Sequence, residues 1–310
     1  MKHIQNKVAE SRRTLPVTFA ICIGIWLTAG LIQHQWWIQF GCFALSVAVM
    51  TELDNNNSLI RIYSRAVTAS YALLSCVPCF LFPSTSGAVF QLCLVTSLFC
   101  LFKCYQDKQA AAWAFYTFLM LGLASMASAL TFWLIPVVWL MMATTLYCLS
   151  WRTFTATILG LLCPYWFALA WILCFNEGDM MPLLEHLMET GHYILPADYL
   201  SLSASQILTF ALLTILTITG IVHYSRKYFL DKIRTREIYY SLMMLWGLAT
   251  LLLIIQPQHD DTMLRVIITA GSPLLGHFLA LTSTRVTNIA SYVIAASVVL
   301  LTVFNLWMAS

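Results

Sequence analysis

The sequence predicts an all-α protein, a polytopic transmembrane helix bundle that forms a single integral membrane domain over residues 1–310. Hydrophobic residues make up 60% of the chain, charged residues only 9%, and the mean hydropathy is +0.80. Ordinary globular chains are about 45–50% apolar and about 25% charged. So little polar surface cannot cover a water-soluble particle. The composition therefore excludes a soluble enzyme, a nucleic-acid binder and a disordered scaffold.

Eleven apolar segments, each bounded by charged residues or by Pro, Asn or Gly, account for most of the chain. A membrane-spanning helix needs about 20 mostly apolar residues. The second segment is short, and a turn near Leu130 and Thr131 is all that separates the fifth from the sixth. In chain order the predicted spans are 16–33, 36–51, 66–83, 87–104, 110–129, 131–149, 154–175, 204–224, 237–255, 263–282 and 287–308.

The first span imitates a secretory signal because it follows the basic stretch from Lys2 to Arg13. Gly30 to His34 contains no A-x-A-like cleavage site, and Trp36 and Trp37 come next. We therefore expect an uncleaved first helix after a short cytoplasmic segment, 1–15.

Charge placement predicts the orientation of these spans, since cytoplasmic loops carry the excess of Lys and Arg. If the N-terminus is inside and all eleven segments cross, 15 of the 16 basic residues fall inside and only Arg265 falls outside. We therefore expect the N-terminus inside, the C-terminus outside and a basic cytoplasmic loop over 225–236. The location that follows is the bacterial inner membrane. The net charge of +3 is a sum over two opposed faces, and no nucleic-acid partner is expected.

The longest polar connection is the outer loop over 176–203. Apolar residues at 183, 184, 187 and 188 have the spacing of an amphipathic helix on the outer leaflet, which Gly191 would end. Glu189 and His192 have the Glu-x-x-His spacing of di-iron bundles, but one copy does not make a metal site.

A polar cluster precedes the tenth span and is the strongest local anomaly. It comprises His259, Asp260 and Asp261, and Arg265 follows one helical turn after Asp261, where the opposite charges can pair. An arginine inside an apolar span is costly unless it is paired or faces a cavity. One interpretation is an outward pocket that binds an anionic substrate through Arg265, with the other three residues as proton acceptors. The other is a structural ion pair that closes the loop.

Deeper in the tenth span, Gly271, Ser272 and Pro273 predict a kink or a break near the bilayer midplane. His277 follows directly. A broken helix with an ionisable residue beside it is how many transporters build a midplane site. The alternative is a kink satisfied by neighbouring helices, with His277 hydrogen-bonded inside the bundle.

Two inner segments, Thr51–Arg65 and Ser225–Glu237, are rich in basic residues. Both could hold anionic lipid headgroups or a lipid pyrophosphate, although positive-inside topology alone also accounts for them. The chain contains no nucleotide-binding, dinucleotide, zinc-protease or kinase signature. We therefore expect no cofactor and no metal, and the sequence identifies no catalytic residue.

Three short stretches carry a resemblance to a known family: Asn55 to Leu59, Trp151-Arg152, and Gly160 to Trp166. In these the chain resembles an uncharacterised family of bacterial multi-pass membrane proteins, a domain of unknown function. That resemblance implies the fold but no activity and no catalytic residues.

The region from Ala110 to Leu173, with Gly122-Leu123-Ala124 and Pro164, is similar to the middle helices of polyprenyl-phosphate-dependent glycosyltransferases of the GT-C type. Those enzymes keep an acidic residue in a large first outer loop. Here that loop is only Gln33 to Gln35 and has no carboxylate, while Glu52 and Asp54 fall inside.

Three functions follow from these observations. The first is a structural or partner-binding membrane component that performs no chemistry; its partners are the lipid bilayer, a lipid-linked anionic substrate or other envelope membrane proteins. The second is a transporter or flippase that uses a broken helix at Gly271–Pro273. The third is a GT-C-like transferase acting on a polyprenyl-linked glycan.

Overall fold

A computed structural model describes residues 9, 11–175, 181, 185, 188, 199, 202–282 and 284–309. Within these residues the chain is all-α, as predicted, with no strand. The α-helices are α2 (Thr14–Thr28), α3 (Trp37–Asn57), α4 (Ala66–Cys76), α5 (Thr85–Lys103), α6 (Ala111–Ala127), α7 (Thr131–Thr144), α8 (Trp151–Phe175), α10 (Ala204–Lys227), α11 (Ile233–Ile255), α12 (Asp260–Leu281) and α13 (Arg285–Ala309). Short 3₁₀ turns add η1 (Cys79–Leu81), η3 (Tyr228–Leu230) and η4 (Pro257–His259).

Each predicted span contains one α-helix, but the helices differ in length. Six of those described are long and apolar enough to cross a membrane: α5, α8, α10, α11, α12 and α13. Four others are shorter apolar helices, and α4 has only 11 residues. At about 1.5 Å per residue, α4 alone covers roughly half of the hydrocarbon core.

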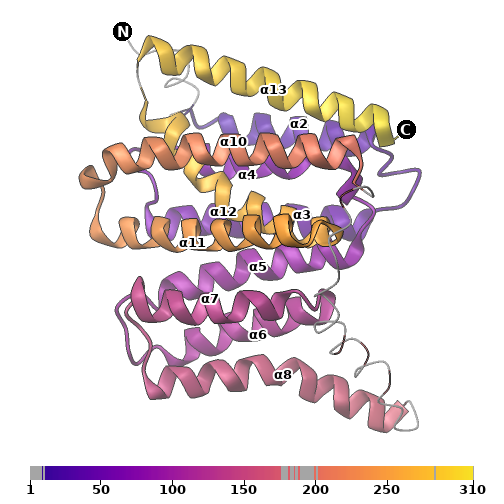
Figure 1. Cartoon of the computed structure of the whole chain (residues 1–310), viewed down its shortest axis with the longest axis vertical. Helices are drawn as coiled ribbons and strands as arrows, with labels where there is room; N and C mark the ends of the chain where they lie inside the picture. The colour runs from indigo at the N-terminus through magenta and orange to yellow at the C-terminus, as the bar shows by residue number, and fades with distance from the viewer. Residues whose placement is uncertain are drawn as a thin grey trace.

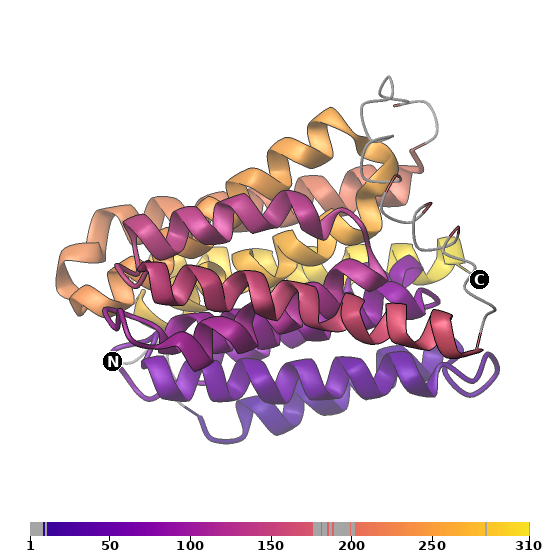
Figure 2. The same cartoon turned by 90° about the horizontal axis from the view of Figure 1, so that it is seen from below.

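The helices run side by side in a slab, with α13 and α8 at opposite edges (Figure 1). Figure 2 shows the same common direction from a second side, with the turns gathered at the two ends. One end, which we call the basic end, carries the α3–α4, α5–α6, α7–α8, α10–α11 and α12–α13 turns. The opposite end carries the α2–α3, α6–α7 and α11–α12 turns and the end of α13.

Basic residues concentrate at the basic end. Thirteen of the fourteen described basic residues lie in or beside its turns or just before α2: Arg12, Arg13, Arg61, Arg65, Lys103, Lys108, Arg152, Arg226, Lys227, Lys232, Arg234, Arg236 and Arg285. The fourteenth, Arg265, is in the first turns of α12, near the opposite end of the bundle. The described basic residues are therefore concentrated at one end of the bundle.

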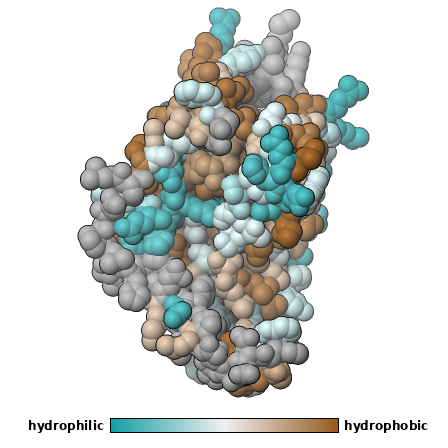
Figure 3. Space-filling model, turned by 90° about the vertical axis from the view of Figure 1, so that its right-hand side faces the viewer, coloured by the Kyte–Doolittle hydropathy of each residue, from teal (hydrophilic) through white to brown (hydrophobic). Residues whose placement is uncertain are grey.

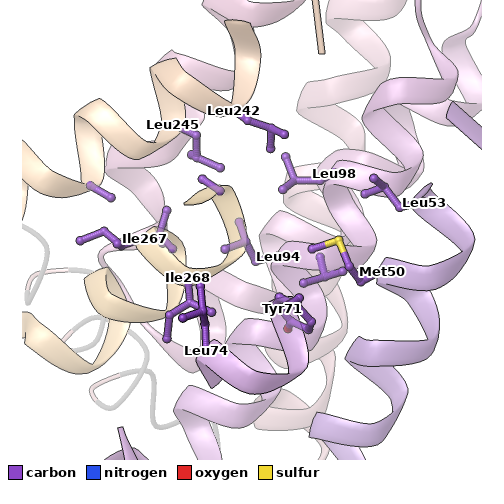
Figure 4. Close-up of a cluster of buried hydrophobic side chains, with 14 of the residues drawn as sticks. Met50, Leu53, Tyr71, Leu74, Leu94, Leu98, Leu242, Leu245, Ile267 and Ile268 are labelled. Atoms are coloured by element: carbon purple, nitrogen blue, oxygen red, sulfur yellow. The ribbon is translucent and has the colours of Figure 1, made fainter. Parts of the chain in front are cut away.

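Helix α12 is the centre of the bundle. It packs against α4, α5, α10 and α11. In its apolar stretch 89% of the residues are buried, compared with 11% in that of α13 and 17% in that of α8. Figure 4 shows side chains of α3, α4, α5, α11 and α12 meeting in one apolar cluster, among them Leu74, Leu94, Leu245 and Ile267. Seven of the ten cysteines are also buried: Cys22, Cys76, Cys79, Cys93, Cys100, Cys104 and Cys148.

The break predicted at Gly271–Pro273 is absent, because α12 continues from Asp260 to Leu281 with Pro273 inside it. Pro273 cannot donate a backbone hydrogen bond to the carbonyl of Thr269. The Ser272 hydroxyl donates to that carbonyl instead, at 3.5 Å. Gly271 lies against Thr217 of α10, so that a Cβ added there would come within 2.3 Å of the Thr217 hydroxyl oxygen. Side-chain hydrogen bonding and close packing thus keep the helix continuous.

The amphipathic helix predicted in the outer loop 176–203 lies outside the described residues, as does most of the N-terminal segment 1–15.

Candidate functional site

The Arg265 side chain is buried near the first turns of α12, with 6% of its surface exposed. Its Nε donates to Asp261 Oδ1 at 2.7 Å, Nη1 to Gln91 Oε1 at 3.0 Å and Nη2 to the Leu81 carbonyl at 2.7 Å. The second oxygen of Asp261 accepts from the Ser84 hydroxyl at 2.7 Å. A buried guanidinium is tolerated when each face of the charge is hydrogen-bonded in this way.

The network around Arg265 continues into α4. Gln91 donates through Nε2 to the Tyr71 hydroxyl at 2.9 Å and to the Ser75 hydroxyl at 3.1 Å. The adjoining cavity, bordered by Gln39 and Arg265 among others, has a volume of about 20 Å³. That is room for about one water molecule. The structure therefore supports the second interpretation of Arg265, an ion pair that fastens α12 to α5 and η1.

The other residues of the predicted outer site surround this ion pair at the opposite end of the bundle. Figure 3 views this end, where hydrophilic residues lie among apolar ones. Asp260 accepts a hydrogen bond from Gln206 Nε2 of α10 at 2.7 Å, and His259 ends η4 with partial burial. Asp260 also borders an apolar groove of about 280 Å³ between α10, α11 and α12. Of the predicted contacts in this group, the pairing of Asp261 with Arg265 is present.

His277 is not part of that group. It lies twelve residues after Arg265 on the same helix, about 18 Å along the axis, and its side chain is fully buried near the basic end. Its Nε2 lies 3.1 Å from Asp231 Oδ2, where an Nε2–H can donate. The other oxygen of Asp231 forms an ion pair with Arg61 Nε at 2.9 Å. Asp231 thereby ties the α10–α11 turn both to α12 and to the α3–α4 turn.

Beside this ion pair is a cavity of about 510 Å³, which we call the basic cavity. Its lining comes from the end of α3, the α3–α4 turn and the α10–α11 turn: Asp54, Asn55, Ser58, Ile60, Arg61, Ile62, Tyr63, Ser64, Arg65, Leu230, Lys232 and Thr235. Three bases from two chain segments thus meet at one cavity. The two segments are those whose composition suggested anionic headgroup binding.

The turns that carry these bases are held in place by hydrogen bonds from other side chains. Arg234 Nη2 donates to Asn57 Oδ1 at 2.8 Å and to the Phe102 carbonyl at 3.2 Å. Arg65 Nη1 donates to Asn55 Oδ1 at 2.5 Å. The backbone of Ser58, at the end of α3, is left-handed, with φ of 48°. This conformation ends α3 and turns the chain toward Arg61.

Two acidic groups lie beside the three bases: Asp231, which is paired with Arg61, and Asp54, which is in the cavity lining. Asp54 is buried, and burial raises the pKa of its carboxyl to about 7, although Arg65 acts in the opposite direction. A neutral Asp54 leaves the positive charges of Arg65 and Lys232 at the cavity, while Asp231 offsets that of Arg61. The cavity therefore has the electrostatics of an anion site whose charge varies near neutral pH.

The sequence placed Asp231 and Lys232 in the candidate segment Ser225–Glu237 but gave neither residue a role of its own. A signal was present, because Asp231 is the single acid within the basic run from Arg226 to Arg236. An acid that only kept a loop soluble would be exposed, yet Asp231 is 4% exposed.

The fold and site define the class as an α-helical protein with several helices able to cross a membrane. Searches of protein-family models, of curated proteins and of solved structures found no match to this chain.

Proposed function

We propose that this chain is a multi-pass protein of the bacterial inner membrane that binds a phosphate-bearing anionic group in the basic cavity. It acts as a binding component of the envelope, with its N-terminus and basic cavity on the cytoplasmic side. The observation that carries the proposal is the convergence of Arg61, Arg65 and Lys232 on one cavity of about 510 Å³. Lys and Arg at the surface of a membrane attract anionic headgroups, by about 1 kcal/mol for each base.

The geometry of the cavity supports binding rather than general surface attraction. Arg61 is oriented by Asp231, and Arg65 by Asn55. An anion entering between them meets guanidinium groups whose side chains are already ordered, which lowers the entropic cost of binding. Guanidinium groups also match the oxygen spacing of phosphate.

Native mass spectrometry of the detergent-solubilised protein tests the proposal with phosphatidylglycerol and phosphatidylcholine as probes. The double variant Arg65→Gln/Lys232→Gln should bind phosphatidylglycerol at least about tenfold more weakly, because it loses two bases worth about 1 kcal/mol each. Phosphatidylcholine should bind weakly to every form.

The matched control is Arg152→Gln/Arg226→Gln, which removes the same charge from exposed positions at the same end but outside the lining of the cavity. It should bind phosphatidylglycerol like the unchanged protein. Equal losses in the two double variants would show that net charge alone attracts the lipid, and would refute the cavity as a site.

A second candidate function, transfer from a polyprenyl-linked glycan, is favoured by the position of Asp260 in the lining of the apolar groove between α10, α11 and α12. In that case a carboxylate would act beside a bound polyprenyl chain. Turnover of a polyprenyl-linked sugar with divalent cations, lost in Asp260→Asn but kept in Gln206→Ala, would establish it. Absence of turnover under varied cations would remove it.

A further inference from the structure

A second, mostly apolar groove lies beside the basic cavity. It lies between α2, α4, α12 and α13, has a volume of about 260 Å³ and is lined by short side chains, among them Thr18, Ala66, Ala69, Ser291 and Ala295. We call it the α13 groove.

The way α13 is attached explains why this groove is open. Near its end, Asn305 Nδ2 donates to the Val77 carbonyl at 2.8 Å and to the Thr209 hydroxyl at 3.1 Å, and its Oδ1 accepts from Ser205 at 2.7 Å. These three hydrogen bonds fasten the end of α13 to α10 and to the turn after α4. Toward the basic end, α13 diverges from α10 (Figure 1). The first half of α13, which includes Ser291 and Ala295, therefore borders the groove and does not pack closely against α10.

The groove and the basic cavity meet at Ser64. Ser64 lines the basic cavity, and its hydroxyl donates to the carbonyl of Ala9 at 2.8 Å and accepts from the backbone N–H of Ala66 at 3.1 Å. Ala9 and Ala66 both line the α13 groove. The charged cavity and the apolar groove are thus adjacent, because Ser64 of the cavity lining hydrogen-bonds to two residues of the groove lining.

We propose that the two sites hold one molecule, an intact anionic phospholipid, with its phosphate in the basic cavity and an acyl chain in the α13 groove. This inference rests on the proposed function and specifies the source of the phosphate as a membrane lipid rather than a free anion. The complementarity is direct, because the bases match the headgroup and the small, mostly apolar side chains match a hydrocarbon chain. Large apolar side chains of α13 near the groove are exposed, among them Ile289 and Val293, so a chain can enter from the side.

The test compares three probes on the full-length protein: dioleoyl phosphatidylglycerol, its dibutyryl analogue, and glycerophosphoglycerol, which is the headgroup without chains. The unchanged protein should bind the dioleoyl lipid at least about tenfold more tightly than the dibutyryl analogue, since each buried CH₂ adds favourable transfer free energy. Ligand-observed ³¹P NMR gives the weaker affinities, and native mass spectrometry the stronger.

Two variants separate the chain from the headgroup. Ser291→Phe/Ala295→Phe places large rings one turn apart on the groove side of α13, where Ser291 is partly buried and Ala295 is exposed, so that the bundle core is not disturbed. It should weaken dioleoyl lipid binding by about tenfold and leave glycerophosphoglycerol binding unchanged. Ala170→Phe, at an exposed position of α8, is the control for adding a ring to an outer helix and should change neither.

The outcomes distinguish the two levels of the proposal. If the groove variant binds the dioleoyl lipid as the unchanged protein does, or if all three probes bind equally, the acyl-chain site is wrong while the headgroup site stands. If Arg65→Gln/Lys232→Gln binds glycerophosphoglycerol and lipid as tightly as the unchanged protein, the proposed function itself fails.

Discussion

At the residue scale, the most costly group in the core is Arg265, and three hydrogen bonds in different directions compensate for its burial. Only one of these partners, Asp261, is close in sequence. Gln91 and Leu81 lie more than 170 residues away along the chain and join only through the tertiary fold. The ion pair could therefore be predicted from spacing, but its burial among α5 and η1 could not.

Arg265→Ala should lower the free energy of unfolding by about 3 kcal/mol, because it leaves buried oxygens of Gln91 and Leu81 without a donor. Thermal unfolding of the solubilised protein measures the change. Arg152→Ala, at an exposed position, should have no comparable effect. An unchanged unfolding midpoint in Arg265→Ala would contradict a structural role. Phosphatidylglycerol binding per folded molecule should stay intact, since Arg265 is at the end opposite the basic cavity.

Asp54 makes anion binding depend on pH. Because burial raises its pKa to about 7, the carboxyl is mostly neutral at pH 6 and mostly charged at pH 8. Phosphatidylglycerol, a phosphodiester, does not titrate in this range and should bind more tightly at pH 6. Asp54→Asn should bind at pH 8 as tightly as the unchanged protein does at pH 6. A pH dependence that persists in Asp54→Asn would assign it to another group.

The same pKa has a consequence for stability, with a defined sign. The folded pKa lies above the unfolded value, so the folded state binds more protons between about pH 4 and pH 7. The contribution of Asp54 to the free energy of unfolding is therefore largest at low pH and declines as the pH rises through about 7. Asp54→Asn should remove this decline from a pH series of unfolding midpoints.

At the element scale, glycines set how closely the helices approach. A Cβ at Gly160 of α8 would lie 2.4 Å from the Phe115 carbonyl of α6, and one at Gly220 of α10 would lie 2.7 Å from the Leu274 backbone of α12. At Gly247 of α11 nothing lies within 4 Å. Small residues at such contacts allow helix backbones to pack in a membrane.

Gly160→Ala and Gly220→Ala should each lower the free energy of unfolding by about 1–3 kcal/mol, since the added methyl group must displace a helix backbone. Gly247→Ala is the matched control and should be neutral or stabilising by up to about 1 kcal/mol, because alanine favours the helix. Unfolding midpoints of the three variants measure the difference. Equal midpoints would show that α8 and α10 can shift without cost.

Helix α12 shows where sequence reasoning reached its limit. Gly271, Ser272 and Pro273 predict a kink or break from local chemistry alone. The helix continues because the Ser272 hydroxyl donates to the Thr269 carbonyl, to which Pro273 cannot donate, and because α10 packs against Gly271. Similarly, Arg265 and His277 share one apolar segment, but the rise of the helix places them at opposite ends. The contact with α10 contributed to the first outcome, whereas the second follows from the geometry of α12 alone.

At the scale of the whole molecule, the distribution of charge was predictable because it follows from the order of apolar segments alone.

The proposed orientation is tested by reporters on the full-length chain. A reporter enzyme that is active only in the periplasm should be active when fused after Ser310. The same reporter should be inactive when inserted into the α10–α11 turn, between Tyr228 and Lys232. Activity at both positions, or only in the α10–α11 turn, would contradict an N-terminus inside with eleven crossings.

The measurement that tests the account most directly is the affinity for dioleoyl phosphatidylglycerol of the unchanged protein, Arg65→Gln/Lys232→Gln and Arg152→Gln/Arg226→Gln at one pH and ionic strength. The cavity that Arg61, Arg65 and Lys232 line predicts a loss of at least about tenfold in the first double variant only. Equal affinities in all three proteins, or equal losses in both variants, would contradict a lipid phosphate site between the α3–α4 and α10–α11 turns.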